Sequence, residues 1–355
     1  MPEIRFRQFR ASLIIGGACG FLLVVYLIIA SGAADVARSM QVIGWWLLPI
    51  TLFHLVPLTL SALSWRELLP PPSRPHVIAI FWIRWIRESI NSLLPVASVG
   101  GDIASMRLAR LRGVPGAQAA ASMVVDITVG AATQLIFVMS GATLLLMRST
   151  EHNAVAVASA VLIGAGVFFA AIAAFIMCQN RGLFGVSAQL TRRLLPQQWL
   201  SVVAAGASAI DEAVVASYRA GSVILGAGVL RLIAWAVEAG EIWLVMQALG
   251  QPLGIIDALI LESLSSGIRA AAFMLPGGLG ALEGGLVMLG ALFGLPADTA
   301  LAISLSKRVR ELVLGLPGLF VWHWIEGHHL LRRSEQPRRV GSGAPAGECT
   351  QSSKV

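Results

Sequence analysis

The chain has 355 residues, of which 56% are hydrophobic and only 13% are charged, and its mean hydropathy is +0.77. A water-soluble domain typically carries about 25% charged residues, so this composition excludes a soluble protein and predicts a polytopic membrane protein. The net charge of +7 comes from arginines clustered between apolar runs, where they indicate topology rather than nucleic-acid binding. The three cysteines, at 19, 178 and 349, form no CxxC motif.

The N-terminal part of the chain contains two predicted transmembrane helices. The apolar run over residues 11–30 is longer than the roughly 7 to 15 residues of a cleaved signal's hydrophobic region, which favours a retained first helix. The second span is expected over 42–63. Trp45, Trp46 and Trp65 flank this span and are typical of residues at the two membrane interfaces.

A helix-breaking segment follows the second span. The apolar run 76–94 stops at Pro95, glycines come next, and a short helix is expected over 102–111. Irregular backbone at membrane depth is tolerated only where protein or a watery cavity covers it, so these two helices are predicted to form a re-entrant hairpin. It returns to the side marked as cytoplasmic by Arg107, Arg110 and Arg112.

The rest of the chain contains further predicted transmembrane helices and a second helical hairpin. Full spans are expected over 117–147, 154–178, 222–249 and 300–324, and a cytoplasmic amphipathic stretch over about 180–220. A second re-entrant pair is predicted at 256–275 and 281–293. Residues 1–330 therefore form a single transmembrane domain, and the Pro/Gly/Ser-rich residues 331–355 are predicted to be a disordered cytoplasmic tail.

One pattern occurs twice in gapless register. Leu94-Pro95, Asp102 and Gly113-Val114-Pro115 return as Leu275-Pro276, Glu283 and Gly294-Leu295-Pro296, at a constant offset because 276 − 95 = 181 and 296 − 115 = 181. Three crossings separate the starts of the two copies, which cover about 76–147 and 256–325, so their topologies are predicted to be inverted. The predicted fold is all-α, with about six full transmembrane helices and two re-entrant helical hairpins in an inverted repeat, and with both termini cytoplasmic. Such broken helices typically form a transporter's substrate site.

Ionisable residues inside the apolar runs are the candidates for function, because each costs about 2.5 to 3.5 kcal/mol at a helix centre unless paired or hydrated. The expected intramembrane polar network consists of Asp126, Arg231, Glu238, Glu241, Lys307 and Glu311. Arg231 and Glu238 are separated by about 10 Å of helical rise, so their partners must lie on other helices. Whether they lock helices together or line a polar cavity is open at this point.

A second set of residues is expected to bind lipid headgroups. These residues are Arg87, Glu88, Asp102, Arg107, Arg269, Glu283 and Arg308. Asp102 and Glu283 would lie at the hairpin tips, while Arg269 and Arg308 would neutralise a polar or anionic headgroup. Lys307, Arg308 and Arg310 point in three directions on a helix, so they cannot all face one ligand. His54 is more simply a buried hydrogen-bonding group than a proton relay, and no histidine spacing indicates a metal site.

Several motifs carry a resemblance to a known family. They are Asn91-Ser92-Leu93-Leu94-Pro95 with Gly100-Gly101-Asp102 and Arg107, then Pro276-Gly277-Gly278-Leu279-Gly280 with Glu283, then Gly294-Leu295-Pro296 through Arg308. Over about residues 10–325 the chain resembles the flippase-like transmembrane region of lysylphosphatidylglycerol synthases, and most of all its stand-alone branch associated with hopanoid biosynthesis. The chain departs from the family at Asp126-Ile127, where an acid–Arg pair is usual, and it lacks the synthases' soluble aminoacyl-transferase domain.

The resemblance implies a bacterial inner-membrane protein that moves a lipid between leaflets or assists its handling. We therefore expect a lipid translocase without cofactors that binds an amphiphile, such as a phospholipid or hopanoid, between its two hairpins. A non-catalytic scaffold that binds lipid-biosynthesis enzymes is the first alternative. A membrane-embedded transferase is the second, although the sequence contains neither HExxH nor an Asp-rich metal motif.

Overall fold

The computed structural model describes residues 33–94, 99–148, 197–272 and 279–334, with a few isolated residues between 25 and 29 and between 166 and 179. Every element within these ranges is helical. The predicted first helix at 11–30, most of the span at 154–178, the hairpin tips at Pro95 and Pro276 and the tail beyond 334 lie outside the described residues.

Three helical segments are long and apolar enough to cross a membrane, namely Ala34–Glu67, Gly116–Arg148 and Gly221–Ala248. The first is a run of α2 (Ala33–Ile43), η1 (Gly44–Trp46), α3 (Leu47–Phe53) and α4 (Leu55–Glu67), and it is longer than the predicted 42–63. The other two are α7 and α11. The protein is thus a multi-pass membrane protein, while the total of six full spans stays a prediction.

The last helix, α14 (Ala297–Ser334), has 38 residues and is longer than the predicted 300–324. It is not among the segments apolar enough to cross a membrane, because Lys307, Arg308, Arg310 and Glu311 interrupt its apolar sequence. α10 (Gln197–Arg219) falls in the predicted amphipathic stretch and packs against α7.

Both predicted hairpins are pairs of packed helices. α5 (Val77–Leu93) packs against α6 (Val99–Leu111), and α12 (Ile255–Ala271) packs against α13 (Ala281–Leu292). In the first pair the Asn91 side chain accepts a hydrogen bond from the Gly101 backbone N–H (2.8 Å). A side chain at position 101 would collide with the Arg87 carbonyl oxygen, so glycine is what lets α5 and α6 approach so closely.

The turns after the two hairpins have the same backbone geometry. Gly113 and Gly294 both adopt positive φ, +92° and +69°, as glycine does after a helix end. Val114 N–H donates to the carbonyl of Ala109 (3.2 Å), and Leu295 N–H donates to that of Gly290 (3.0 Å). The two glycines are 181 residues apart, since 294 − 113 = 181, which is the offset of the sequence repeat. The sequence repeat is therefore also a repeat of local structure.

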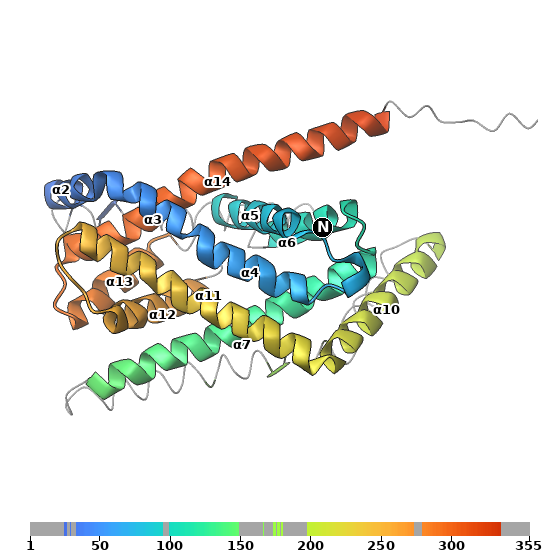
Figure 1. Ribbon diagram of the computed structural model, residues 1–355, viewed down its shortest axis with the longest axis horizontal. Helices are drawn as coiled ribbons and strands as arrows, with labels where there is room; N and C mark the ends of the chain where they lie inside the picture. The colour runs from blue at the N-terminus through green and yellow to red at the C-terminus, as the bar shows by residue number, and fades with distance from the viewer. Residues whose placement is uncertain are drawn as a thin grey trace, which may run out of the picture.

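The long helices that follow these turns run in opposite directions across the molecule (Figure 1). Arg148, at the end of α7, forms an ion pair with Asp257 near the start of α12. Ser39 of α2 donates a hydrogen bond to Asp298 near the start of α14 (3.2 Å). The turn before α14 therefore lies at the end of the molecule where α7 finishes, which is the arrangement that an inverted repeat requires.

Each hairpin has an apolar core of its own. The first core gathers residues of α4, α5, α6 and α7 around Trp65, and the second gathers residues of α11, α12, α13 and α14 around Ile242. Trp65 is fully buried and its indole N–H donates to Ser122 Oγ (3.3 Å). The interpretation of Trp65 as an interface residue is therefore wrong, whereas Trp45 is 90% exposed.

We predict that the loop before α12 faces outward and that the turn between α6 and α7 faces the cytoplasm. Gln251 and Arg112 are exposed in these two segments. In a variant without native cysteines, an impermeant maleimide should modify Gln251→Cys in intact cells and Arg112→Cys only after permeabilisation. The opposite labelling of the two positions would contradict the inverted topology.

Candidate functional site

A cavity of about 380 Å³ lies between the two hairpins. Side chains of α4, α5, α7, α11, α12, α13 and α14 line it, so both copies of the repeat contribute. Its ionisable lining residues are His54, Arg84, Glu88, Arg231, Glu238, Glu262, Arg269, Lys307 and Glu311. Ionisable groups at membrane depth normally face such a polar space, since lipid cannot solvate them.

Asp126 of α7 is the centre of one ion-pair network. Its carboxylate accepts from Arg84 Nη1 (3.0 Å) and Arg87 Nη1 (2.5 Å), both on α5, and from Arg231 Nη2 on α11 (3.2 Å). Arg87 also donates through Nε to Asp102 at the start of α6 (2.5 Å). Asp126 is fully buried, so these arginines replace the solvation that water would otherwise give its carboxylate.

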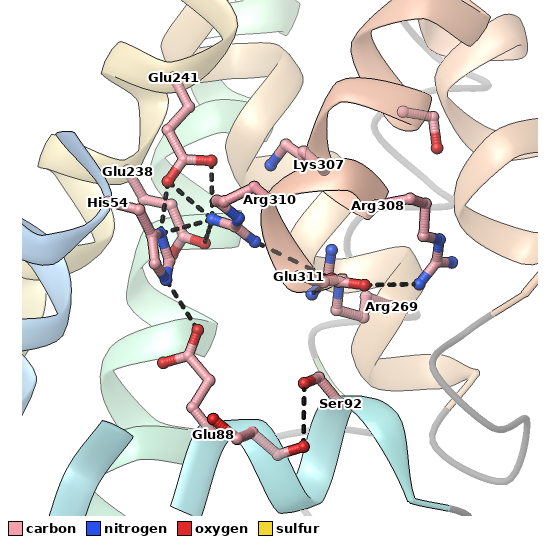
Figure 2. Close-up of polar contacts among 12 residues, drawn as sticks. His54, Glu88, Ser92, Glu238, Glu241, Arg269, Lys307, Arg308, Arg310 and Glu311 are labelled. Atoms are coloured by element: carbon pink, nitrogen blue, oxygen red, sulfur yellow. Dashed lines mark hydrogen bonds and ion pairs between the residues drawn. The ribbon is translucent and has the colours of Figure 1, made fainter. Parts of the chain in front are cut away.

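Arg310 of α14 is the centre of a second network (Figure 2). Its Nη1 lies 2.7 Å from both carboxylate oxygens of Glu241, 3.8 Å from Glu238 and 2.5 Å from Nδ1 of His54. His54 lies between α3 and α4, where Pro57 removes a backbone donor and interrupts the helix. The network thus joins the first long span to α11 and α14.

Lys307 and Arg308 bind partners on the second hairpin. Lys307 Nζ contacts Glu262 of α12 (2.5 Å), while Arg308 contacts Glu283 of α13 through Nε (3.0 Å) and Glu311 through Nη1 (3.0 Å). With Arg310 bound to Glu241 of α11, the three neighbouring cations reach three different helices. Their directions are those expected from about 100° of rotation per residue.

Asp126 and Lys307 correspond at the repeat offset of 181 residues and carry opposite charges, whereas their hairpin partners Arg84 and Glu262 are 178 residues apart (262 − 84 = 178), three residues short of that offset. Arg84 lies seven residues after the start of α5 and binds Asp126, ten residues after the start of α7. Glu262 lies seven residues after the start of α12 and binds Lys307, ten residues after the start of α14. The hairpin supplies the cation in the first half and the anion in the second.

We define the central network as the ion-paired residues around the cavity. Its seven cations are Arg84, Arg87, Arg231, Arg269, Lys307, Arg308 and Arg310, and its eight carboxylates are Glu88, Asp102, Asp126, Glu238, Glu241, Glu262, Glu283 and Glu311. His54 contacts two of the carboxylates. With a neutral His54 the formal charge of the network is therefore −1, and with a protonated His54 it is zero.

The network contains both locked and accessible groups. The side chains of Lys307 and Glu262 are buried against each other, and Asp126 and Glu241 are buried as well. By contrast, 41% of the Glu88 side chain and 37% of the Arg269 side chain are exposed, and both line the cavity. These two are the charged groups best placed to contact a molecule inside it.

The position of Glu283 near a hairpin tip predicts a contact with a ligand, whereas in the structure its contacts are with other protein groups. Glu283 is buried, accepts a hydrogen bond from the Gly280 backbone N–H (2.7 Å) at the start of α13, and binds Arg308 and Ser304. Neither Glu283 nor Arg308 is among the residues that line the cavity. Both therefore support the second hairpin from behind the lining.

The other expected headgroup ligands divide in the same way. Arg87 and Asp102 form the buried side of the Asp126 network, and Arg107 lies exposed on α6 away from the cavity lining. Of the seven residues expected to contact headgroups, Glu88 and Arg269 line the cavity. From the expected polar network, Arg231, Glu238, Lys307 and Glu311 also line it, whereas Asp126 and Glu241 lie behind it.

Four members of the site were not among the expected site residues, namely His54, Arg84, Glu262 and Arg310. The sequence carries a signal for three of them. Arg84 lies one turn before Glu88, at i and i+4, and so shares a helical face with an expected residue. Glu262 and Arg310 lie inside predicted apolar runs, like the expected residues of the polar network. His54 becomes apparent only through its contacts with distant parts of the chain.

Comparison with known proteins agrees with this architecture. Residues 12–318 match the family model described as the lysylphosphatidylglycerol synthase TM region. The chain belongs to this family. It is also 24% identical, over 305 residues, to a UPF0104 membrane protein of Methanothermobacter thermautotrophicus, and the match covers 82% of this chain and 87% of that protein. No solved structure is a significant match. Membership in this synthase transmembrane family indicates a lipid-related function in the membrane.

We predict that Asp126→Asn strongly destabilises the protein. The change leaves Arg84, Arg87 and Arg231 near a buried amide, and removal of one partner from a buried ion pair typically costs about 3 to 5 kcal/mol. Thermal unfolding and the yield of monodisperse protein in detergent measure the effect. Asp35→Asn, in an exposed pair with Arg38, is the matched control and should change little. Equal stability of both variants would contradict the structural role of Asp126.

Proposed function

We infer that this protein moves a lipid between the leaflets of the membrane, with the polar headgroup passing through the charged cavity while the acyl chains stay in the bilayer. The cavity is the observation that supports this function. Its volume of about 380 Å³ falls within the roughly 300 to 1,000 Å³ of small-molecule sites. Both hairpins line it, so it lies where a membrane transporter of broken helices binds its substrate.

The lining carries both signs of charge. Arg84, Arg231, Arg269 and Lys307 line the same space as Glu88, Glu238, Glu262 and Glu311. A headgroup that enters it exchanges its hydration for contacts with fixed charges, which lowers the cost of crossing the hydrocarbon region. Arg269 is the proposed contact for phosphate or another anionic group, because a guanidinium binds such groups with two parallel hydrogen bonds.

The proposal extends to location and partners. The protein is a non-enzymatic component of a bacterial inner membrane, with both termini in the cytoplasm, and it works beside enzymes of hopanoid or phospholipid synthesis. The motifs around Asn91 and Gly277 support this placement through their resemblance to the hopanoid-associated branch. Parallel assays with labelled phosphatidylglycerol and a labelled polar hopanoid distinguish the two lipid classes.

A scaffold for lipid-synthesis enzymes is the main rival function, and blocking the cavity separates it from transport. Ser61 lines the cavity on α4, and Val56, on the same helix, is exposed. Ser61→Trp should stop lipid movement because the large ring occupies the headgroup's path, whereas Val56→Trp should leave it unchanged. Dithionite quenching of fluorescent lipids in proteoliposomes measures the rate. Unaltered lipid movement in a well-folded Ser61→Trp protein would exclude this route.

We predict that Arg269→Gln slows lipid movement by roughly tenfold to a hundredfold. Such a factor corresponds to the loss of a hydrogen bond to a charged group, about 1.5 to 3 kcal/mol. Arg269→Lys should recover only part of the rate, because an ammonium group lacks the planar fork. Arg38→Gln removes an exposed cation from α2 and is the control. Rates equal to wild type in both Arg269 variants would remove Arg269 from the headgroup path.

A further inference from the structure

His54 is held between two carboxylates. Its Nε2 lies 2.7 Å from Glu88 Oε1 on α5, and its Nδ1 lies 2.5 Å from Glu241 Oε1 on α11 (Figure 2). Two further charged groups face the ring, Arg310 of α14 and, beside it, Glu238 of α11. The imidazole is therefore surrounded by three acids and one base, all from helices that pack around the first long span.

A neutral imidazole can donate to only one of these two carboxylates, and only the tautomer with its proton on Nε2 leaves a lone pair for Arg310 Nη1, which lies 2.5 Å from Nδ1. The neutral ring has one N–H and one lone pair, whereas both ring nitrogens lie within hydrogen-bond distance of a carboxylate oxygen. With a proton on each nitrogen, His54 donates to Glu88 and to Glu241. After loss of the Nε2 proton, a lone pair faces the Glu88 carboxylate and repels it. The contact between His54 and Glu88 thus depends on one exchangeable proton.

The charge of the central network points to the same proton. Seven cations oppose eight carboxylates, so the network carries a formal charge of −1 until one more proton is bound. An uncompensated charge at membrane depth is costly, and protonation of His54 is one change that removes it. Since His54 contacts the network's most exposed carboxylate, Glu88, this proton is also the one nearest the cavity.

The pair of His54 and Glu88 lies between two cavities. Both residues line the large cavity and also a second one of about 10 Å³, which extends between α5 and α14. That smaller volume is close to what one water molecule needs. A proton can therefore reach these two side chains from the large cavity, and a second, smaller space adjoins the same side chains.

A bound metal ion is a weaker explanation of the cluster. His54, Glu238 and Glu241 bring three potential ligand atoms within 4.8 Å of one another. The guanidinium of Arg310 is already there, 2.7 Å from both oxygens of Glu241. A divalent cation would have to displace this arginine or share the carboxylate with it, whereas a proton on His54 needs no such change.

We propose that His54 and Glu88 form a proton-binding site that couples lipid movement to the proton gradient across the membrane. This proposal rests on the proposed lipid translocation and adds its energy source. A proton from the large cavity binds the Glu88 carboxylate and passes to Nε2 of His54, which restores the ion pair and draws Glu88 against α4. Release of that proton regenerates the neutral imidazole and frees the Glu88 side chain in the headgroup's path, so one proton exchanges per cycle.

The decisive test measures lipid distribution under a pH gradient. Wild-type protein is reconstituted in vesicles of phosphatidylcholine and phosphatidylglycerol with fluorescent phosphatidylglycerol as the probe. If one proton crosses the membrane with each lipid, the ratio of probe between the two leaflets can approach about tenfold per pH unit, because each pH unit is a tenfold ratio of proton activity. The asymmetry should reverse when the gradient is reversed. His54→Gln and Glu88→Gln should lose it, whereas the control His323→Gln, on an exposed part of α14, should keep it.

The outcomes separate the two proposals. If wild-type protein equilibrates the probe equally under either gradient, the proton-binding site is wrong and lipid translocation stands. If wild-type protein moves no probe, the proposed translocation of phosphatidylglycerol is wrong. The proton-binding site is then tested by ¹⁵N NMR of protein with labelled histidine, and the His54→Gln variant identifies the His54 signal. The His54 signal should change protonation within a titration from about pH 5 to pH 10. A His54 that stays in one form across that range would overturn the site, and this measurement needs no folded variant of Glu88.

Discussion

Pairing of ionisable side chains at membrane depth is the constraint on which this structure depends. Asp126 and Arg310 each bind partners on other helices, and both are buried. Buried ion pairs add little net stability compared with apolar contacts, but a misplaced helix would leave a charge unpaired at a cost of several kcal/mol. The networks therefore fix which helices lie together and in what register, while the apolar cores around Trp65 and Ile242 supply the packing.

This constraint also explains why a cavity is needed. Locked pairs such as Lys307 with Glu262 satisfy each other and leave nothing to offer a ligand. Glu88 and Arg269 are only partly satisfied by protein groups and remain exposed to the cavity. Groups of this kind would be unstable against lipid, so their presence at membrane depth requires a polar space. These few accessible groups are the ones placed to contact a ligand, and the locked pairs hold them in position.

Local features of the sequence predicted local structure well. The end of α5 at Leu93 and the glycine turns at 113 and 294 follow from backbone preferences that act over a few residues. Partners across the fold did not follow, because periodicity gives the direction of a side chain but not the helix that meets it. Glu283 is an example, since its hairpin position indicated a ligand while the structure makes it a helix cap and a partner of Arg308.

The exchange of signs between the two halves has a physical reason. If the second half had the same signs as the first, each long helix would carry an acid and each hairpin a base. The two halves would then present the same order of charges to the cavity. With Arg84–Asp126 reversed as Glu262–Lys307, each half stays paired internally, while the long helices α7 and α14 carry opposite charges. The space between the two hairpins is therefore asymmetric in charge, although the two halves repeat the same local backbone turns.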